Sequence, residues 1–163
     1  MEKDALIKLA AAALLLGFAA FMTLRHLRSQ KGDSDLAFFY DLSRKELFKA
    51  SRTNIPPIKG LDNSLEDAVR AVVVSTNGNP QDRSSWQISY LEMYSPELKA
   101  QMEVARAGGT SPAMGRGAAS FHRLVKRPGD LDWSPMNSPE GEKIVNEWLT
   151  LGPGKTPAAV CVP

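Results

Sequence analysis

Few side chains in this sequence are suited to catalysis. Of its two histidines only His122 lies beyond the N-terminal segment, and the single cysteine, Cys161, stands two residues from the C-terminal residue. A Cys–His or Ser–His mechanism would need His122, because function requires reactive groups held near one another. No nucleophile-elbow glycine pattern accompanies any serine. We therefore expect no catalytic residue, and a small enzyme that uses His122 is kept as an alternative.

Metal and cofactor patterns are also missing. Without a cysteine pair or a second histidine in the same part of the chain, no zinc site is predicted. The acidic triplets at 33–35 and 130–132 are too short and irregular for a calcium loop. The segment MGRGAAS, residues 114–120, has glycines that can face an anion but lacks the lysine and strong helix of a phosphate-binding loop. We expect no cofactor and no metal.

Two further features suggest contacts with other molecules. HRLVKRPG, residues 122–129, is basic enough to touch phosphates, but a solvated edge strand explains it as well. The net charge of +2 is nearly balanced, so no nucleic-acid partner is expected. Trp86 and Trp148 fit strand and helix patterns, whereas Trp133 stands in a polar, turn-rich segment. If exposed, Trp133 marks a surface that contacts a protein partner.

The strands that would position these residues are marked by apolar runs. Residues 38–42 and 46–49 flank Ser43-Arg44-Lys45 and predict a hairpin. The paired prolines at 56 and 57 predict an extended segment that is not a central strand. The Val72-Val73-Val74 run predicts a central strand buried on both faces, and WQISYLEMY, residues 86–94, predicts the next strand.

Two helices begin with the same three residues. Ser-Pro-Glu at 95–97 and again at 138–140 places serine at the N-cap, proline at the first helical position and glutamate in the first turn. The first helix should end at Gly108-Gly109 and the second before Gly152-Pro153.

The remaining segments complete the expected fold. Residues 108–120 predict a mobile loop, residues 121–127 an edge strand, and the tail PAAVCVP a last strand. Strands with interspersed helices and no regular βαβ alternation indicate the α+β class. We expect an N-terminal transmembrane helix followed by a mainly antiparallel sheet with two helices on one face.

The N-terminal segment is the strongest signal in the chain. Residues 9–24 are apolar except Thr23, and with residues 5–7 they reach about twenty residues, the length that spans a bilayer. A cleaved signal peptide is a second interpretation, because Gly17-Phe18-Ala19 resembles a cleavage site. The apolar run continues past that site, which favours a retained anchor. A buried globular helix is the third interpretation, and the absence of an amphipathic stripe argues against it.

Basic residues flank this span on both sides. Lys3, Lys8 and the amino terminus precede it, while Arg25, Arg28 and Lys31 follow. Three positive charges on each side leave the side of the membrane open under the positive-inside rule. The closeness of Arg25 and Arg28 to the span favours a cytoplasmic domain slightly. The predicted anchor residues are Leu9, Leu14, Leu15, Leu16, Phe18, Phe21 and Leu24, and those expected to contact headgroups are Lys8, Arg25, Arg28 and Lys31.

Several phrases together resemble a set of uncharacterised bacterial single-span membrane proteins with a small exposed α+β domain. They are FFYDLSRKELF, IPPI, AVRAVVVST, YLEMYSPELK, SPEGEKIVNEWL and the terminal VCVP. Relatives in that set carry cysteines after the Val-Arg-Ala strand, where this chain reads Ser75-Thr76-Asn77-Gly78-Asn79. The resemblance therefore implies the architecture without a metal or disulfide role at that loop.

These observations combine into one expectation. Residues 1–31 are predicted to be the anchor and its basic flank, 32–37 a linker, and 38–163 a single α+β domain. The expected function is a membrane-anchored, non-catalytic accessory or scaffold protein, a subunit of a bacterial membrane assembly with a protein partner. A pilin-like filament subunit is an alternative, although it would require a glycine directly before the hydrophobic run and an early glutamate after it, and here Gly17 lies inside the run.

Overall fold

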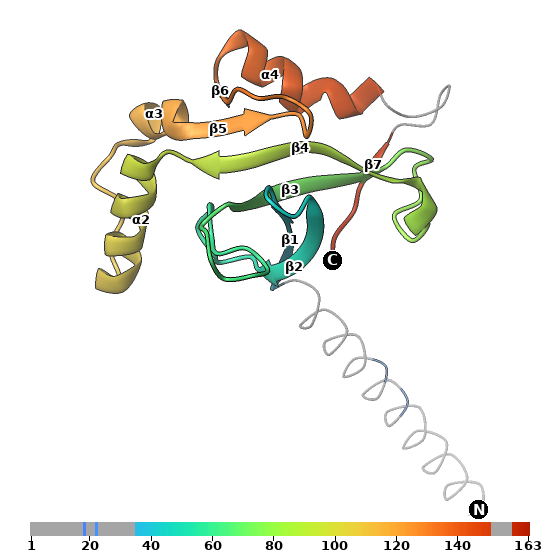
Figure 1. Ribbon diagram of the computed structural model, residues 1–163, viewed down its shortest axis with the longest axis horizontal. Coiled ribbons are helices and arrows are strands. Elements are labelled where there is room, and N and C mark those ends of the chain that lie inside the picture. The colour runs from blue at the N-terminus through green and yellow to red at the C-terminus, as the bar shows by residue number, and fades with distance from the viewer. Residues whose placement is uncertain (1–17, 19–21, 23–34, 151–157) are drawn as a thin grey trace, which may run out of the picture. The chain divides into compact units, whose positions relative to one another are not determined.

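The computed structural model describes Phe18, Met22, residues 35–150 and residues 158–163 (Figure 1). The chain divides into two compact units, Met1–Asp35 and Leu36–Pro163. In the first unit, Phe18 and Met22 are helical and exposed. Every other residue predicted to anchor the chain or to contact headgroups lies outside the described residues. Within the described part of the chain, no helix is both long and apolar enough to cross a bilayer.

The second unit is an α+β domain built on an antiparallel sheet, as the sequence predicts. The strand order is β2-β1-β3-β4-β5-β6, and β7 pairs with β3. The strands are β1 (Leu36–Asp41), β2 (Glu46–Ser51), β3 (Ala68–Ser75), β4 (Trp86–Tyr94), β5 (Arg123–Lys126), β6 (Ser134–Pro135) and β7 (Ala159–Val160). The helices are α2 (Pro96–Gly108), α3 (Arg116–Ala119) and α4 (Pro139–Asn146), with 3-10 turns η1 (Arg83–Ser85), η2 (Ser120–His122) and η3 (Glu147–Thr150).

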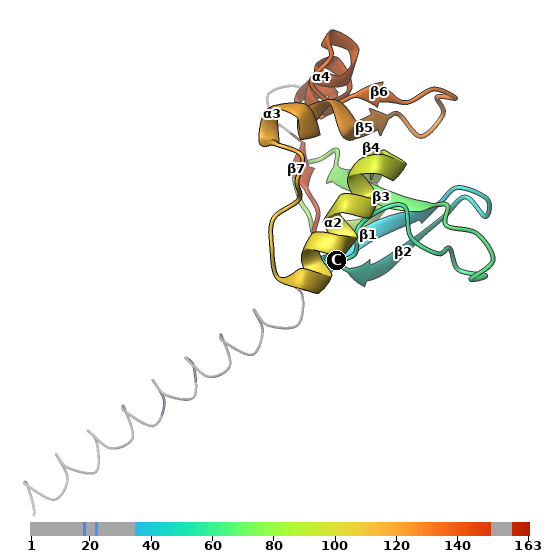
Figure 2. The same cartoon turned by 90° about the vertical axis from the view of Figure 1, so that its left-hand side faces the viewer.

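The helix α4 and the β1–β2 hairpin lie at opposite ends of the sheet. Figures 1 and 2 both place α4 beside β5 and β6, and its contacts reach β4. The β1–β2 hairpin is confirmed, and its turn is closed by the buried carboxylate of Asp41. This carboxylate accepts the backbone N–H of Arg44 and of Leu61, each at 2.8 Å. Lys45 takes a φ of 55° where a glycine is usual, and the Asp41 hydrogen bond helps to hold that turn.

The predicted central strand is confirmed: β3 lies between β1 and β4. One core cluster covers a face of the sheet around it. Its members come from β1 to β4, the first turn, the loop before β6 and the tail: Phe38, Tyr40, Leu42, Leu47, Val69, Ala71, Val73, Trp86, Ile88, Leu91, Met93, Trp133 and Cys161. The predicted core role of Trp86 is confirmed, since its ring meets that of Phe38 edge-on with centroids 5.4 Å apart.

The strand β4 contains a β-bulge that the sequence does not predict. Its register with β3 shifts by one residue, which leaves Ser89 without a paired residue on β3. Strict alternation would place Ile88 and Leu91 on opposite faces, because side chains alternate along a strand. The extra residue brings both into the same core cluster.

Both predicted helix starts are confirmed. The Ser95 hydroxyl accepts the N–H of Leu98 at 3.2 Å, and the Ser138 hydroxyl accepts the N–H of Gly141 at 3.1 Å. The helix α2 ends at Gly108 and is capped by Gly109, whose φ of 64° suits a residue without a Cβ.

Two sequence predictions for residues 108–127 are wrong. The predicted loop contains the short helix α3, so the described part of the domain has a third α-helix. The predicted edge strand over residues 121–127 shrinks to β5, because Phe121 and His122 form η2. The strand β5 is also not an edge, since β6 pairs with it and Val125 and Lys126 are buried. The pairing of β5 with β6 joins residues on either side of a loop, and the local pattern of charges cannot predict such a contact.

The predicted C-terminal strand is confirmed as β7, and it ends beside Cys161. The Cys161 N–H donates to the carbonyl of Val73 at 2.8 Å, and the residue is 4% exposed. Burial raises the pKa of the Cys161 thiol, which favours the protonated form over the reactive thiolate.

We expect Cys161 to react with a thiol reagent such as DTNB at least about tenfold more slowly in the folded chain than in urea. Because the chain has one cysteine, the absorbance change reports the opening of the C-terminal tail directly. Equal rates in buffer and urea would show that the tail does not stay on β3.

Candidate interaction site

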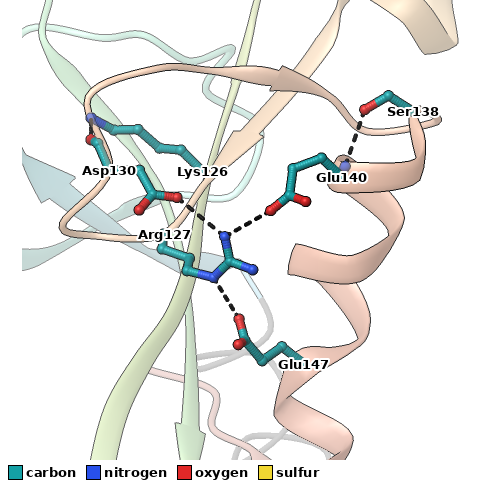
Figure 3. A network of polar contacts seen from close by, with 7 residues as sticks. Lys126, Arg127, Asp130, Ser138, Glu140 and Glu147 are labelled. Atoms are coloured by element: carbon teal, nitrogen blue, oxygen red, sulfur yellow. Dashed lines mark hydrogen bonds and ion pairs between the residues drawn. The ribbon is translucent and has the colours of Figure 1, made fainter.

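A cluster of charged side chains surrounds Arg127, the residue that follows β5 (Figure 3). The guanidinium Nη1 lies 3.0 Å from Glu140 Oε1 and 3.3 Å from Asp130 Oδ2, and its Nε lies 2.7 Å from Glu147 Oε2. Glu140 stands in the first turn of α4 and Glu147 opens η3. Arg127 therefore ties the end of β5 to the C-terminal helix.

The charge of this cluster is predominantly negative. The three carboxylates raise the pKa of Arg127 further, chiefly through the hydrogen bonds of Glu147 and Glu140, so the guanidinium stays charged. A second cation, the ammonium of Lys126, donates to the carbonyl of Asp130 at 3.0 Å. With both cations counted, three carboxylates still outnumber them, and their side chains are 41% to 51% exposed.

A hollow of about 530 Å³ lies beside Arg127. Its lining residues are Gln87, Ile88, Ser89, Arg127, Pro128 and Glu147. Ser89, the bulge residue, is 9% exposed, and its hydroxyl has no hydrogen-bond partner among the described residues. A buried hydroxyl without a partner is costly, so each such group calls for an explanation.

The ring of Trp133 is half-buried against the core cluster. The Lys126 ammonium lies 5.0 Å from its centroid, a cation–π contact that joins the loop before β6 to β5. Packing therefore explains why a tryptophan occupies this polar segment. Its role as a partner contact stays a prediction.

His122 faces a serine and a carboxylate, but not in a catalytic arrangement. Its Nδ1 lies 2.8 Å from the Ser95 hydroxyl and 3.9 Å from Glu97 Oε2. In a catalytic triad the serine and the carboxylate contact different ring nitrogens. Here both face Nδ1, and the Ser95 hydroxyl is also engaged as the N-cap acceptor of α2. The geometry assigns His122 to stabilising the start of that helix.

A second hollow, about 460 Å³, separates α2 from the proline-containing loop. The Lys99 ammonium reaches across it to the carbonyl of Pro57 at 2.7 Å and pairs with Glu66, whose pKa it lowers. Arg106 donates to the carbonyl of Thr53 at 3.0 Å. Lys99 and Arg106 thus hold the loop against α2.

Comparison with protein-family models, curated proteins and solved structures found no match. The site therefore has to be interpreted from its own geometry. In the part of the chain that the structure describes, no group of three or more histidine, cysteine or acidic side chains is placed to hold a metal ion.

The sequence analysis missed both the Arg127 cluster and the hollow. The Ser-Pro-Glu start did place Glu140 in the first turn of a helix, where a carboxylate is free to meet a cation. Nothing in the sequence showed that this turn would face Arg127. The bulge at Ser89 had no signal, because bulges depend on pairing with another strand.

Proposed function

We propose that this chain is a single-pass, membrane-anchored accessory or scaffold protein that takes part in a bacterial membrane assembly through its folded unit. The observation that carries the proposal is the apolar run of residues 9–24, followed at once by Arg25. The bacterial source follows only from the resemblance to bacterial single-span proteins.

Two features of the folded unit support a binding role over a catalytic one. The histidine that an enzyme would use is engaged at the start of α2. The hollow beside Arg127 is lined by a strand and by charged side chains of both signs, which suits a polar ligand that also presents apolar groups.

Alkaline washing of membranes tests the anchor. The full chain, expressed in bacteria with a C-terminal tag, should stay in the membrane pellet after the wash. Replacing Leu14, Leu15 and Leu16 together by arginine should move it to the supernatant, because each charge at the centre of a span costs about 3 kcal/mol. The matched control makes the same three changes to arginine at exposed leucines of the folded unit, Leu65, Leu131 and Leu149. It should leave the chain in the pellet.

Three results would contradict this function. Release of the unaltered chain by the wash would show that it is not an integral membrane protein. An intact mass beginning near Ala20 would show that the segment is a cleaved signal peptide. Filaments in particle images of the membrane fraction would favour the pilin-like alternative.

A further inference from the structure

Half of the strand β4 has a neighbouring strand on one side and no described strand on the other. The strand β5 pairs with Leu91–Tyr94 and stops at Lys126, and the chain turns away at Pro128. Residues Trp86–Tyr90, which we call the β4 edge, lie beside β3, which pairs with all of them except the bulge residue Ser89. No described strand pairs with their other side. The Trp86 N–H donates to the carbonyl of Arg83, and the outward backbone groups after it are available to a further strand.

The β4 edge lacks most of the protection that exposed strand edges usually have, since the bulge at Ser89 is its one such feature. Edges are normally protected by charged residues, by proline, by a β-bulge or by being very short. The edge strand β2 carries Glu46 and Lys49, and β6 has two residues of which one is Pro135. The β4 edge reads WQISY, with neither charge nor proline. This contrast indicates that the β4 edge is able to pair with a strand of another molecule.

The hollow beside Arg127 lies along this edge. Gln87, Ile88 and Ser89 form one wall, while Arg127, Pro128 and Glu147 form the other. Ser89 contributes the buried hydroxyl that has no partner among the described residues. A ligand with polar groups along its length would supply that missing hydrogen bond.

Charge selects the kind of segment that fits. The wall opposite the β4 edge belongs to the cluster in which carboxylates outnumber cations (Figure 3). Asp130, Glu140 and Glu147 each leave part of the carboxylate side chain exposed, so a lysine or arginine of an incoming segment meets a complementary surface.

We propose that the β4 edge binds an extended peptide segment of a partner protein, which adds a strand beside β4 and directs a basic side chain at the Arg127 cluster. In this mode the backbone hydrogen bonds supply affinity, and alternate side chains supply specificity. The five residues of the edge span about 17 Å, the length of a short strand, with the bulge at Ser89 inside that span. The inference goes beyond the proposed function, since it holds whether or not the chain is anchored in lipid.

A displayed library of random linear peptides, selected on the full chain in detergent, tests this site. We expect enriched peptides that alternate apolar residues with lysine or arginine. Hydrogen exchange of the complex should slow at the backbone amides of Trp86–Tyr90. Methylating one backbone nitrogen of a selected peptide that pairs with β4 should weaken binding about tenfold, the effect of losing one hydrogen bond of about 1.4 kcal/mol.

Charge variants at the exposed Gln87 sharpen the test. Gln87→Glu should tighten binding of a basic selected peptide, and Gln87→Lys should weaken it by a similar factor, because the two changes have opposite sign and nearly equal size. The control Glu46→Gln, on the edge strand β2, makes the same single-charge change as Gln87→Lys and should have no effect. Circular dichroism checks that the variants keep the fold.

Four outcomes would overturn the proposal. They are the absence of any enriched peptide, protection that appears on β2 instead of β4, equal affinity after backbone methylation, and equal affinity of the two Gln87 variants. Protection of the β4 edge that rises with protein concentration and needs no peptide would show that a second copy of this chain occupies it. None of these measurements requires the N-terminal segment to span a bilayer, so they fail or succeed separately from the membrane assay.

Discussion

Replacing Gly141 by alanine should lower the free energy of unfolding by about 3 kcal/mol. Gly141 lies in the first turn of α4, where the helix meets the chain leaving β6. An added Cβ would lie 2.9 Å from the Cα of Met136 and closer still to the carbonyl oxygen of Pro135. These are backbone atoms, so relief requires α4 to move away from β6 and from the Arg127 cluster. Urea unfolding of the full chain in detergent, followed by tryptophan fluorescence, measures the loss.

A second helical glycine provides the matched control. Gly117 lies in α3, and an alanine Cβ there would meet nothing within 4 Å. Gly117→Ala should therefore leave stability unchanged or raise it by about 0.5 kcal/mol, because alanine favours helix over the unfolded chain. If both variants unfolded at the same urea concentration, the close approach of α4 to β6 would be disproved.

Sequence patterns predicted the elements whose signals are local. Serine, proline and glutamate at two helix starts specify an N-cap by chemistry that involves only neighbouring residues, and both caps form. The valine run of β3 marks a central strand because burial on both faces demands apolar side chains throughout. The prolines at 56 and 57 excluded a central strand for a similarly local reason.

The errors concern contacts between distant segments. The charges of residues 122–127 suggested an exposed edge, yet β6 pairs with β5. Lys126 is buried, and its ammonium contacts the Asp130 carbonyl and the Trp133 ring. The basic residues of this segment are thus engaged in contacts within the domain and do not mark an exposed strand edge. The same holds for Arg127, whose partners Glu140 and Glu147 belong to α4 and to the 3-10 turn η3 that follows it. The sequence placed the start of this helix correctly but could not orient it.

The candidate site follows from these long-range features. The hollow exists because β5 pairs only with Leu91–Tyr94, the second half of β4. The bulge then places Ser89 of the first half beside the hollow. A sequence method would need the β4–β5 register to find it. The lack of charge in WQISY was visible from the start, but it indicates an open edge only once the strand order shows that nothing described pairs with it.

Replacing Arg123 by glutamine should cost about 2 kcal/mol, while replacing its partner Glu92 by glutamine should cost about 1 kcal/mol or less. The Arg123 Nη2 lies 2.9 Å from Glu92 Oε1. The Glu92 side chain is 7% exposed and that of Arg123 is 43% exposed. Losing the arginine leaves a buried carboxylate without its partner, whereas losing the carboxylate leaves a cation that water can reach. Chemical unfolding of both single variants measures this asymmetry.

The pKa of the Tyr90 phenol gives a second, independent measure of the Arg123–Glu92 pair. Burial raises the pKa of Tyr90, the Glu92 carboxylate raises it further, and the Arg123 guanidinium lowers it. Arg123→Gln should therefore raise the pKa of Tyr90 and Glu92→Gln should lower it, as measured by NMR titration of its ring. The double variant should recover most of the stability lost in Arg123→Gln, because no buried carboxylate remains. Equal costs for the two single variants, with shifts of the Tyr90 pKa in the same direction, would show that the charges of this pair are not coupled across the sheet.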